Sequence, residues 1–301
     1  MRLDIREITC RNALNRVRGM PFKWSLNPYR GCSHACWYCY ARETHTYFDL
    51  NGGRDFERVI FAKINVAERL RVQVRSPRWE RETVAVGAAT DPYQPVEGHL
   101  RLTQACLREF LAARSPIGLI NKSTLIRRDR HLLQDLARAA GVSVTVSIPI
   151  ADPHLARRIE PSVPPPAERF RVVRELADLN LDVGVNMAPV LPGLTDSDAA
   201  IAELMRLARE HGARRVGTRM LHLKPEPKRW FMHNLRRFFP HLEPLYADLY
   251  PGGVTYVDSS VDDDLEARAD ALREFIGPAQ SETPALAPPP PPIQLPLASG
   301  F

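Results

Sequence analysis

Three cysteines lie close together near the start of the chain, at Cys32, Cys36 and Cys39, in a CxxxCxxC pattern. Thiolates are soft ligands that suit iron–sulfur centres. A [4Fe-4S] cluster has one more iron than three cysteines can occupy, and that iron is free to chelate the amino and carboxylate groups of a small molecule. The spacing therefore favours an iron–sulfur cluster that binds a small ligand and passes an electron to it.

A structural zinc ion is the alternative for the same loop, with His34 or His45 as its fourth ligand. Zinc sites more often pair two CxxC units at a distance, and the sequence contains no second unit of this kind. Cys10 and Cys106 are isolated and are interpreted as ordinary thiols. The pattern therefore favours the iron–sulfur cluster over zinc.

The composition is that of a globular protein with a basic surface. The chain has 301 residues, 5 cysteines and a net charge of +6 at pH 7. The small, odd number of cysteines argues against a disulfide scaffold. No apolar run reaches the roughly 20 residues of a membrane helix, and the first residues lack the pattern of a secretory signal. We expect a cytoplasmic protein that does not bind membranes, whose cations are either simply solvated or suited to acidic partners.

Short apolar runs alternate with segments of helical periodicity in the middle of the chain, which predicts a parallel α/β architecture. Six runs are predicted to be strands: residues 22–26, 83–87, 117–120, 142–148, 182–187 and 215–218. Asp129 and Gly141 bound one predicted helix, and Asp196 or Ser197 begins another that ends at Gly212. Six strand–helix units predict an open, partial barrel, and a doubly wound sheet is the alternative from the pattern alone.

We predict four regions along the chain: an N-terminal lead-in at 1–20, the barrel at 21–220, a helical C-terminal extension at 221–277 and a disordered proline-rich tail at 278–301. The first part of the extension mixes Lys and Arg with Trp and Phe. Such a mixture suits contacts with phosphates and bases. It also suits an amphipathic helix that buries its aromatic residues and exposes its cations, and we favour this second interpretation.

The cysteine loop resembles the signature of the radical SAM superfamily. The resemblance implies a partial (β/α)6 TIM-type barrel in which Cys32, Cys36 and Cys39 bind a [4Fe-4S] cluster and S-adenosyl-L-methionine occupies the fourth iron. It also implies reductive cleavage to a 5′-deoxyadenosyl radical, which abstracts hydrogen from a substrate, and an electron donor such as flavodoxin or ferredoxin. Tyr38 matches the aromatic position whose backbone contacts the adenine.

A wider pattern is similar to spore photoproduct lyase and its uncharacterised, DNA repair photolyase-like relatives. It consists of the segments NPYRGCSHACWYCYAR, ATDPYQPVEG, NKS, SIP, RRIEPSVPPPAER and GVNMAPVLPGLTD. Lys122 and Ser147 match the lysine and the serine that bind the methionyl carboxylate of the cofactor in that lyase. An ammonium and a hydroxyl suit a carboxylate that is partly withdrawn from water.

The same resemblance suggests further contacts with the cofactor. Thr90 and Asp91 follow the second predicted strand, where superfamily members approach the amino group of S-adenosylmethionine, although Asp91 could equally cap an Asp-Pro turn. Asn186 lies on the fifth predicted strand and is a candidate for a contact with the ribose. These three residues complete the predicted cofactor site.

Tyr40 is the candidate catalytic residue, because it matches a tyrosine implicated in the hydrogen relay of the lyase. That enzyme also uses a cysteine near the end of the second strand, where this chain has Ala88. Repair of the spore thymine dimer is therefore not expected. Nucleic acid is our leading substrate class, with a peptide or a small metabolite as the alternative, and a non-catalytic, zinc-stabilised nucleic-acid-binding protein is the rival function. We expect a monomer or a weak dimer.

Overall fold

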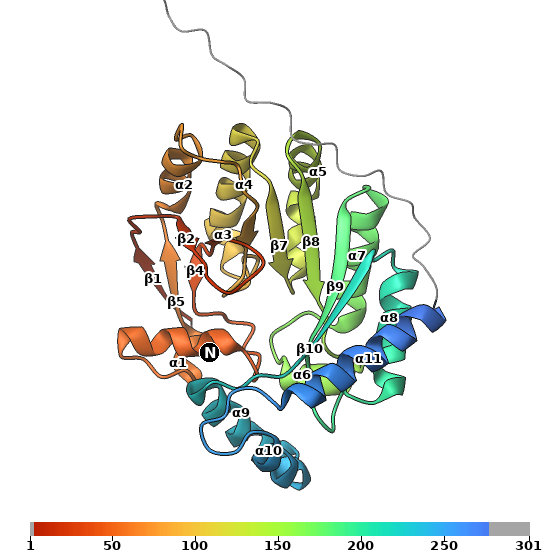
Figure 1. Ribbon diagram of the computed structural model, residues 1–301. Coiled ribbons are helices and arrows are strands. Elements are labelled where there is room, and N and C mark those ends of the chain that lie inside the picture. Colours follow the sequence, from red (N-terminus) through yellow and green to blue (C-terminus); the bar gives the residue numbers. More distant parts are fainter. Residues whose placement is uncertain (1–2, 277–301) are drawn as a thin grey trace, which may run out of the picture.

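The computed structural model describes residues 3–276, and its main sheet consists of six parallel strands with one antiparallel strand at the edge (Figure 1). The parallel strands follow one another across the sheet in the order of the sequence. They are β3 (Trp24–Leu26), β6 (Val84–Val86), β7 (Ile117–Asn121), β8 (Val142–Ser147), β9 (Asp182–Val190) and β10 (Arg215–Met220), and the edge strand is β2 (Leu14–Arg16).

The sequential strand order confirms all six predicted strands and the partial barrel. A doubly wound sheet reverses its strand order at an inner switch point, and no such reversal occurs among the described residues. Most of the predicted strands form because their apolar residues can be buried, as in β8, where Val142, Val144 and Val146 are buried, whereas in β10 only Met220 is buried. Strand β8 ends at Ser147, opposite Asn186 of β9.

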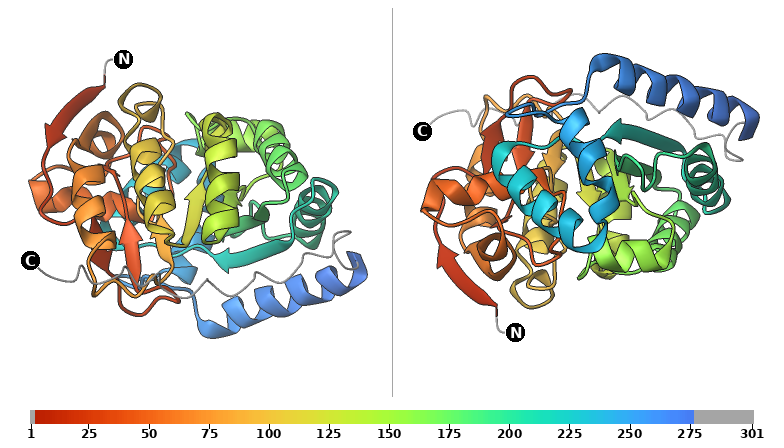
Figure 2. Two further views of the ribbon diagram at one scale, coloured as in Figure 1. Left: turned by 90° about the horizontal axis from the view of Figure 1, so that it is seen from above. Right: turned by 90° about the horizontal axis from the view of Figure 1, so that it is seen from below.

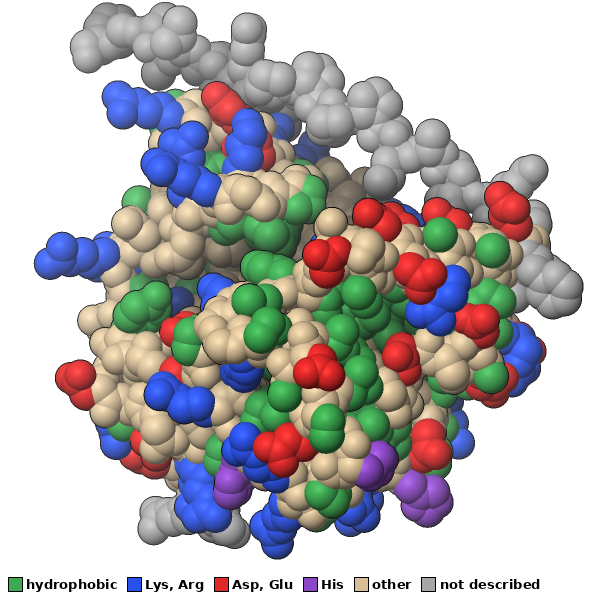
Figure 3. Space-filling model, turned by 60° about the horizontal axis from the view of Figure 1, so that its bottom comes forward, with side chains coloured by type: hydrophobic (Ala, Val, Ile, Leu, Met, Phe, Trp, Pro, Cys, Tyr) green, Lys and Arg blue, Asp and Glu red, His purple; other side chains and the backbone are tan. Residues whose placement is uncertain are grey.

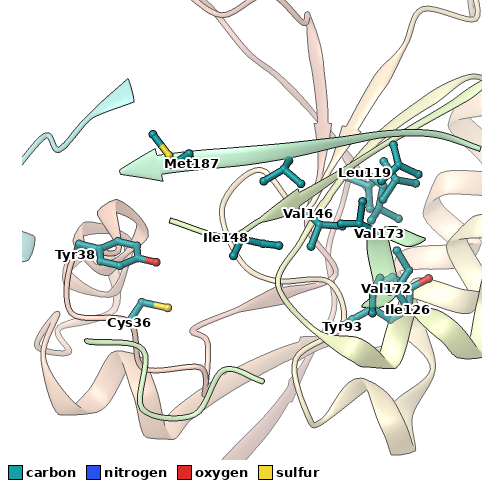
Figure 4. Packing of buried hydrophobic residues seen from close by; sticks show 14 of the residues in the cluster. Cys36, Tyr38, Tyr93, Leu119, Ile126, Val146, Ile148, Val172, Val173 and Met187 are labelled. Carbon is teal, nitrogen blue, oxygen red and sulfur yellow. The ribbon is translucent and has the colours of Figure 1, made fainter. Parts of the chain in front are cut away.

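Helices cover the outer face of the sheet (Figure 2). The long helices of this layer are α2 (Val66–Val74), α4 (Leu102–Ala113), α5 (Arg130–Ala139), α7 (Pro166–Asp178) and α8 (Asp198–Glu210). Shorter elements lie between them: η1 (Tyr40–Phe48), α1 (Arg54–Arg58), α3 (Glu97–Leu100), η2 (Thr124–Asp129) and α6 (Pro153–Ile159). Figure 4 shows part of the resulting core, in which Leu119 and Val146 of the sheet lie near Val172 and Val173 of α7.

The two predicted helix starts differ in their capping. Ser197 precedes α8 and its side chain accepts a hydrogen bond from the backbone N–H of Ala200, as an N-cap should. Asp129 precedes α5, but its side chain does not cap the helix. Its carboxylate instead accepts hydrogen bonds from the hydroxyl of Tyr93 and the guanidinium of Arg128, because the preceding 3₁₀ turn directs it into the protein.

The lead-in contributes to a second, smaller sheet that we did not predict. This sheet has the order β1 (Asp4–Ile8), β5 (Val59–Lys63) and β4 (Tyr29–Arg30). All five residues of β5 are buried, and β4 leads directly into the cysteine loop. The small sheet therefore fixes the start of that loop against the barrel.

The C-terminal extension is helical, as predicted, with α9 (Pro225–Phe238), η3 (Pro240–Leu242), α10 (Glu243–Leu249) and α11 (Ser259–Ile276). In α9 Phe231 and Leu235 are buried, whereas Arg236 and Arg237 are exposed, which confirms the amphipathic interpretation. The predicted disordered tail at 278–301 lies outside the described residues. None of the helices in residues 3–276 combines the length and the apolar character needed to cross a membrane.

Candidate functional site

The cysteine loop begins with a glycine that no other residue can replace without strain. Gly31 has a φ of +78°, and a Cβ placed on it would lie 2.5 Å from the carbonyl oxygen of Val59. The next residue, Cys32, donates its backbone N–H to the carbonyl of Phe56 at 3.0 Å. The first two residues of the loop therefore pack against β5 of the small sheet and against α1.

Two side chains from outside the loop hold its backbone. Gln94 donates from its amide to the carbonyl of Gly31 at 3.0 Å and accepts from the backbone N–H of Ser33 at 3.1 Å. Asn27 accepts from the backbone N–H of Ala89 at 2.8 Å. These bonds join the ATDPYQP segment to the cysteine loop, so two of the segments singled out in the sequence act as one unit.

Arg42 holds the loop from its other end and was not recognised as important in the sequence. Its guanidinium is fully buried and donates to the carbonyl of Cys36 at 2.7 and 3.0 Å. It also donates to the carbonyls of Gly52 and Gly53 and forms an ion pair with Glu57 at 2.6 Å. Five donors in a rigid fork suit this task, which a lysine could not perform.

Tyr38, Lys122 and Ser147 meet on the inner side of the cysteine loop. The ammonium of Lys122 lies 2.8 Å from Ser147 Oγ and 3.0 Å from the Tyr38 hydroxyl. Lys122 directly follows β7, and Ser147 is the last residue of β8. These strands are parallel neighbours, so their carboxyl ends place both residues at the same edge of the sheet. Figure 4 shows Cys36 and Tyr38 projecting to the same side, towards Ile148 of the barrel.

Glu160 completes this group, and we name Tyr38, Lys122, Ser147, Glu160 and Arg169 the inner pocket. The Glu160 carboxylate accepts from Lys122 at 3.0 Å through Oε1 and from Arg169 at 2.6 Å through Oε2, and the Tyr38 hydroxyl donates to it as well. Arg169 also donates to the carbonyl of Ser147 at 2.9 Å. The inner pocket is therefore a connected network of hydrogen bonds.

Glu160 is ionised in this network. Burial by itself opposes the charged form, but Arg169 and Lys122 outweigh it and lower the Glu160 pKa to about 2. Two cations and one carboxylate leave the inner pocket with a net positive charge. Sequence reasoning missed Glu160 and Arg169, although both belong to the RRIEPSVPPPAER segment that was singled out.

Asp91 and Thr90 face the same region but are engaged with the protein. Asp91 accepts from the backbone N–H groups of Tyr93 at 2.8 Å and Lys122 at 2.6 Å, which is the turn-capping geometry considered as the alternative for this residue. Thr90 donates from its hydroxyl to the carbonyl of Tyr29 at 3.0 Å. Asp91 therefore positions the backbone of Lys122, and its contact with a bound amino group stays a prediction.

Both histidines considered as zinc ligands contact the protein through one ring nitrogen, while His34 Nε2 and His45 Nδ1 have no hydrogen-bond partner among the described residues. His34 is buried with Nδ1 3.2 Å from the carbonyl of Ser162 and Nε2 3.3 Å from Asp91. His45 is buried with Nε2 3.0 Å from the carbonyl of Val59. Among the described residues, no three His, Cys, Asp or Glu side chains form a group that could hold a single metal ion.

By the chemistry of their thiols the three cysteines suit an iron–sulfur cluster, although they do not form a group that would hold a single metal ion. Cys32 and Cys36 are buried and Cys39 is partly buried, and all three are free thiols. Burial raises the pKa of Cys36 to about 12, with the Glu160 carboxylate adding to the effect and Lys122 opposing it. The buried thiols therefore ionise only with a strong cationic partner, which the irons of a cluster provide. Cys10 and Cys106 lie elsewhere, Cys106 in the core on α4.

Tyr40 follows Cys39 at the start of η1 and remains accessible. Its side chain is 44% exposed, and its ring lies 5.6 Å from that of His222. The His222 ring in turn stacks on Tyr256 at 5.4 Å, and Tyr256 is 60% exposed. Asn186 lies on β9 opposite Ser147 of β8 on one side and Gly217 of β10 on the other, and it lines a separate hollow beside β10.

One family profile and several uncharacterised relatives match this chain. A profile of the radical SAM superfamily matches residues 26–205. An uncharacterised protein of Mycobacterium tuberculosis is 41% identical over 254 residues, which are 83% of this chain and 75% of the relative. An uncharacterised protein of Methanocaldococcus jannaschii is 25% identical over 202 residues, which are 67% of this chain and 73% of the relative.

Among solved structures, a mutant of spore photoproduct lyase with bound AdoMet and dinucleoside spore photoproduct has a similar fold. The TM-score is 0.67 at 14% sequence identity, and the match covers 91% of this chain and 80% of that one. The lyase in complex with dinucleoside spore photoproduct gives a TM-score of 0.65 at 14% identity, over 91% and 80% of the two chains. At this identity the likeness concerns the fold.

Proposed function

The chain belongs to the radical SAM superfamily, and on that premise we propose that Cys32, Cys36 and Cys39 hold its [4Fe-4S] cluster while Lys122 and Ser147 bind the carboxylate of S-adenosylmethionine. The protein is a radical SAM enzyme with these two cofactors. Membership in this family sets aside the zinc-stabilised, non-catalytic alternative. When bound, these cofactors would supply a carbon-centred radical for the abstraction of hydrogen.

The inner pocket is the observation that carries this proposal. Lys122 and Arg169 bring two positive charges and Glu160 brings one negative charge, so a ligand carboxylate would neutralise the group. Lys122 already lies 2.8 Å from Ser147 Oγ, and both groups can donate to a carboxylate without rearranging the backbone. Charge-assisted hydrogen bonds of this kind are about twice as strong as neutral ones.

The remaining predicted residues have supporting roles in the proposal. The aromatic ring of Tyr38 forms a wall of the inner pocket, and its backbone is the expected contact for the adenine. Thr90 joins its turn to the backbone of Tyr29, Asp91 holds the backbone of Lys122, and Asp91 is the candidate acceptor for the amino group. Asn186 stays the candidate for the ribose. Tyr40 is the proposed catalytic residue in the transfer of hydrogen.

We propose nucleic acid as the substrate class. The stack of Tyr40, His222 and Tyr256 offers exposed aromatic rings, which are the usual platforms for nucleobases. Burial, together with the cations Lys224 and Arg219, lowers the pKa of His222, so its ring is neutral near pH 7. The same two cations could contact the phosphates of a nucleic acid. The similar fold of a lyase solved with a dinucleoside is consistent with this proposal.

Spore photoproduct repair itself is not part of the proposal. Ala88 stands where the lyase pattern requires a hydrogen-donating cysteine, and Cys106 is buried in the core on α4. A product radical in this chain would therefore have to receive its hydrogen from another group. Tyr40 is the candidate, because its ring is accessible beside the cysteine loop.

The test starts from anaerobic reconstitution with iron and sulfide. We expect a brown protein with about four irons per chain, which forms 5′-deoxyadenosine when dithionite and S-adenosylmethionine are added. Deuterated single-stranded DNA should then transfer its label to 5′-deoxyadenosine, as measured by mass spectrometry. Absence of 5′-deoxyadenosine from a fully loaded protein would contradict the cofactor chemistry. Transfer of label from a deuterated peptide library and not from DNA would contradict the substrate class.

A further inference from the structure

A basic hollow lies on the outer side of the cysteine loop, between α1, the end of α6 and α9, and we name it the outer groove. Its volume is about 360 Å³, and its lining includes Trp37 and Phe238 together with Arg54, Arg58, Arg158 and Arg237. Figure 3 views the molecule with its lower end brought forward, and Lys and Arg side chains lie there among Asp, Glu and His side chains. The proposed cofactor site does not use this groove.

The four arginines of the outer groove have no carboxylate partners within the described part of the chain. Arg54, Arg58, Arg158 and Arg237 form no ion pair there, although Arg229 and Arg236 on the same α9 do. Glu57 also lines the groove, but its charge is balanced by the buried Arg42 at 2.6 Å. The groove therefore carries a concentrated positive charge that attracts an acidic surface.

Two of these guanidinium groups are held against the same aromatic ring. Arg158 lies 4.9 Å and Arg237 lies 5.1 Å from the ring centre of Phe238. The Phe238 ring stacks in turn on Trp37 at 5.3 Å. Cation–π contacts fix the two charges in place, and their mutual repulsion would be relieved by a carboxylate that binds between them.

The outer groove approaches the cysteines from the side opposite the inner pocket. Trp37 lies between Cys36 and Tyr38 in the chain, and its ring packs on α9 while those two neighbours project towards the barrel (Figure 4). Trp37 and Ala35 are 6% and 8% exposed. A partner in the groove would therefore come close to the cluster ligands without entering the space of S-adenosylmethionine or of a substrate.

We propose that the outer groove docks a small, acidic electron-carrier protein, which delivers one electron to the cluster from the Trp37 side. This inference rests on the proposed function, because it requires the cluster in the cysteine loop. In the transfer the carrier is oxidised by one electron and the cluster is reduced by one electron, and no bond forms or breaks. Electron transfer becomes slower with distance, so a groove lined by the loop itself is the favourable place for docking.

Nucleic acid is the competing occupant of a basic, aromatic surface, but the groove fits it less well. Base stacking needs an accessible ring face, whereas Trp37 is buried against Phe238 and the guanidiniums of Arg158 and Arg237 lie on the Phe238 ring. A substrate in the groove would also be separated from the inner pocket by the cysteine loop. An acidic protein surface requires only accessible charges, and Arg54, Arg158 and Arg237 are exposed while Arg58 is partly exposed.

The test uses the reconstituted protein and a purified bacterial flavodoxin as the acidic carrier. The charge-reversal pair Arg158→Glu and Arg237→Glu is compared with a matched pair, Arg69→Glu and Arg108→Glu, which lies on the exposed surface of α2 and α4. Binding of oxidised flavodoxin is measured by calorimetry. Electron transfer is followed through the absorbance of the flavodoxin semiquinone after mixing with its hydroquinone.

The groove pair should weaken flavodoxin binding and slow the transfer by at least about tenfold at low ionic strength. The difference should shrink as salt is added, and the control pair should stay near the wild type. The milder pair Arg158→Gln and Arg237→Gln should have an intermediate effect. Equal losses in groove and control pairs, or no loss in the groove pair, would overturn the proposal. So would a groove pair that weakens binding of a single-stranded oligonucleotide and leaves flavodoxin unaffected.

Dithionite separates this proposal from the proposed function, because it reduces the cluster without docking. The groove pair should keep the wild-type yield of 5′-deoxyadenosine with dithionite and lose yield only with flavodoxin. Loss with both reductants would contradict a docking role and would indicate damage to the loop. If the wild type itself gives no 5′-deoxyadenosine with dithionite, the proposed function fails, and flavodoxin binding by calorimetry still decides whether the groove docks the carrier.

Discussion

The inner pocket and the outer groove lie on opposite sides of one cysteine loop, and their charges are arranged differently. In the inner pocket Glu160 joins Lys122 and Arg169 in buried ion pairs. In the outer groove Arg158 and Arg237 are exposed and have no carboxylate partner among residues 3–276. The cations of the inner pocket are therefore held in place by a carboxylate of the protein, whereas the arginines of the outer groove are available to bind a partner.

This difference has a physical reason. A buried cation without a partner costs several kcal/mol, so the protein itself must supply most of the counter-charge in the inner pocket. An exposed arginine costs little because water solvates it. A pocket that must orient a small ligand benefits from the first arrangement, and a surface that binds and releases another protein benefits from the second. Four sets of variants test this contrast.

The largest effect is expected from removal of a cluster ligand. Cys36→Ala should reduce the iron content after anaerobic reconstitution from about four per chain to a small remainder, because the buried loop then offers only two thiolates. Iron and sulfide analysis measures this directly. Cys106→Ala is the matched control, since Cys106 is a buried cysteine of the core, and it should retain the iron. An intact cluster in Cys36→Ala would contradict the ligand assignment.

The next effect concerns the stability of the inner pocket. Glu160→Ala should lower the free energy of unfolding by about 3–5 kcal/mol, because it leaves Lys122 and Arg169 buried with unpaired charges. Glu203→Ala removes a carboxylate from an exposed ion pair with Arg206 and should cost far less. Anaerobic urea denaturation of the reconstituted variants compares the two. Similar losses at both positions would show that the inner pocket is not organised by Glu160.

A smaller effect is expected on cofactor binding. Lys122→Met keeps the length of the side chain but removes a charge-assisted hydrogen bond, which contributes about 1.5–3 kcal/mol. The affinity for S-adenosylmethionine should therefore fall by about 10–100-fold, as measured by equilibrium dialysis on the reconstituted protein. Lys23→Met, at an exposed lysine paired with Glu82, should bind normally. Unchanged affinity in Lys122→Met would remove the proposed carboxylate contact.

The smallest effect on stability and on cofactor binding is expected from substitutions in the outer groove. Arg158→Gln combined with Arg237→Gln should leave the free energy of unfolding unchanged or slightly raised, because two like charges on the Phe238 ring repel each other. Any gain should disappear at high salt. Affinity for S-adenosylmethionine should not change. A large loss of stability would show that these arginines are structural, and the contrast between the two sides of the loop would not hold.

The sequence predicted the barrel well because most of its strands carry apolar residues at buried positions, at least at every second residue. Val142, Val144 and Val146 of β8 are an example. The small sheet was missed for two different reasons. β1 is short and mostly exposed, so its residues give no apolar signal, whereas Val59–Lys63 of β5 is an apolar run whose partners lie far apart in the sequence.

In the site, the residues that sequence reasoning could predict were those with a recognisable pattern. Lys122 and Ser147 were found by resemblance, and the structure places them 2.8 Å apart. Glu160 and Arg169 were missed because they look like charges at helix ends exposed to solvent. Glu160 and Arg169 are buried together only because α6 and α7 pack against each other beneath the loop. The local spacing of residues in the sequence does not indicate this packing.

Electron paramagnetic resonance of the reduced, reconstituted protein tests most directly the central claim, that the loop holds a cluster with an open iron beside a carboxylate site. We predict the signal of a reduced [4Fe-4S] cluster in the wild type, and a change in its g values when S-adenosylmethionine is added. In Lys122→Met the same cluster signal should be present, and the change should require a much higher concentration of S-adenosylmethionine. A wild-type spectrum that S-adenosylmethionine does not alter at saturating concentration would contradict the account.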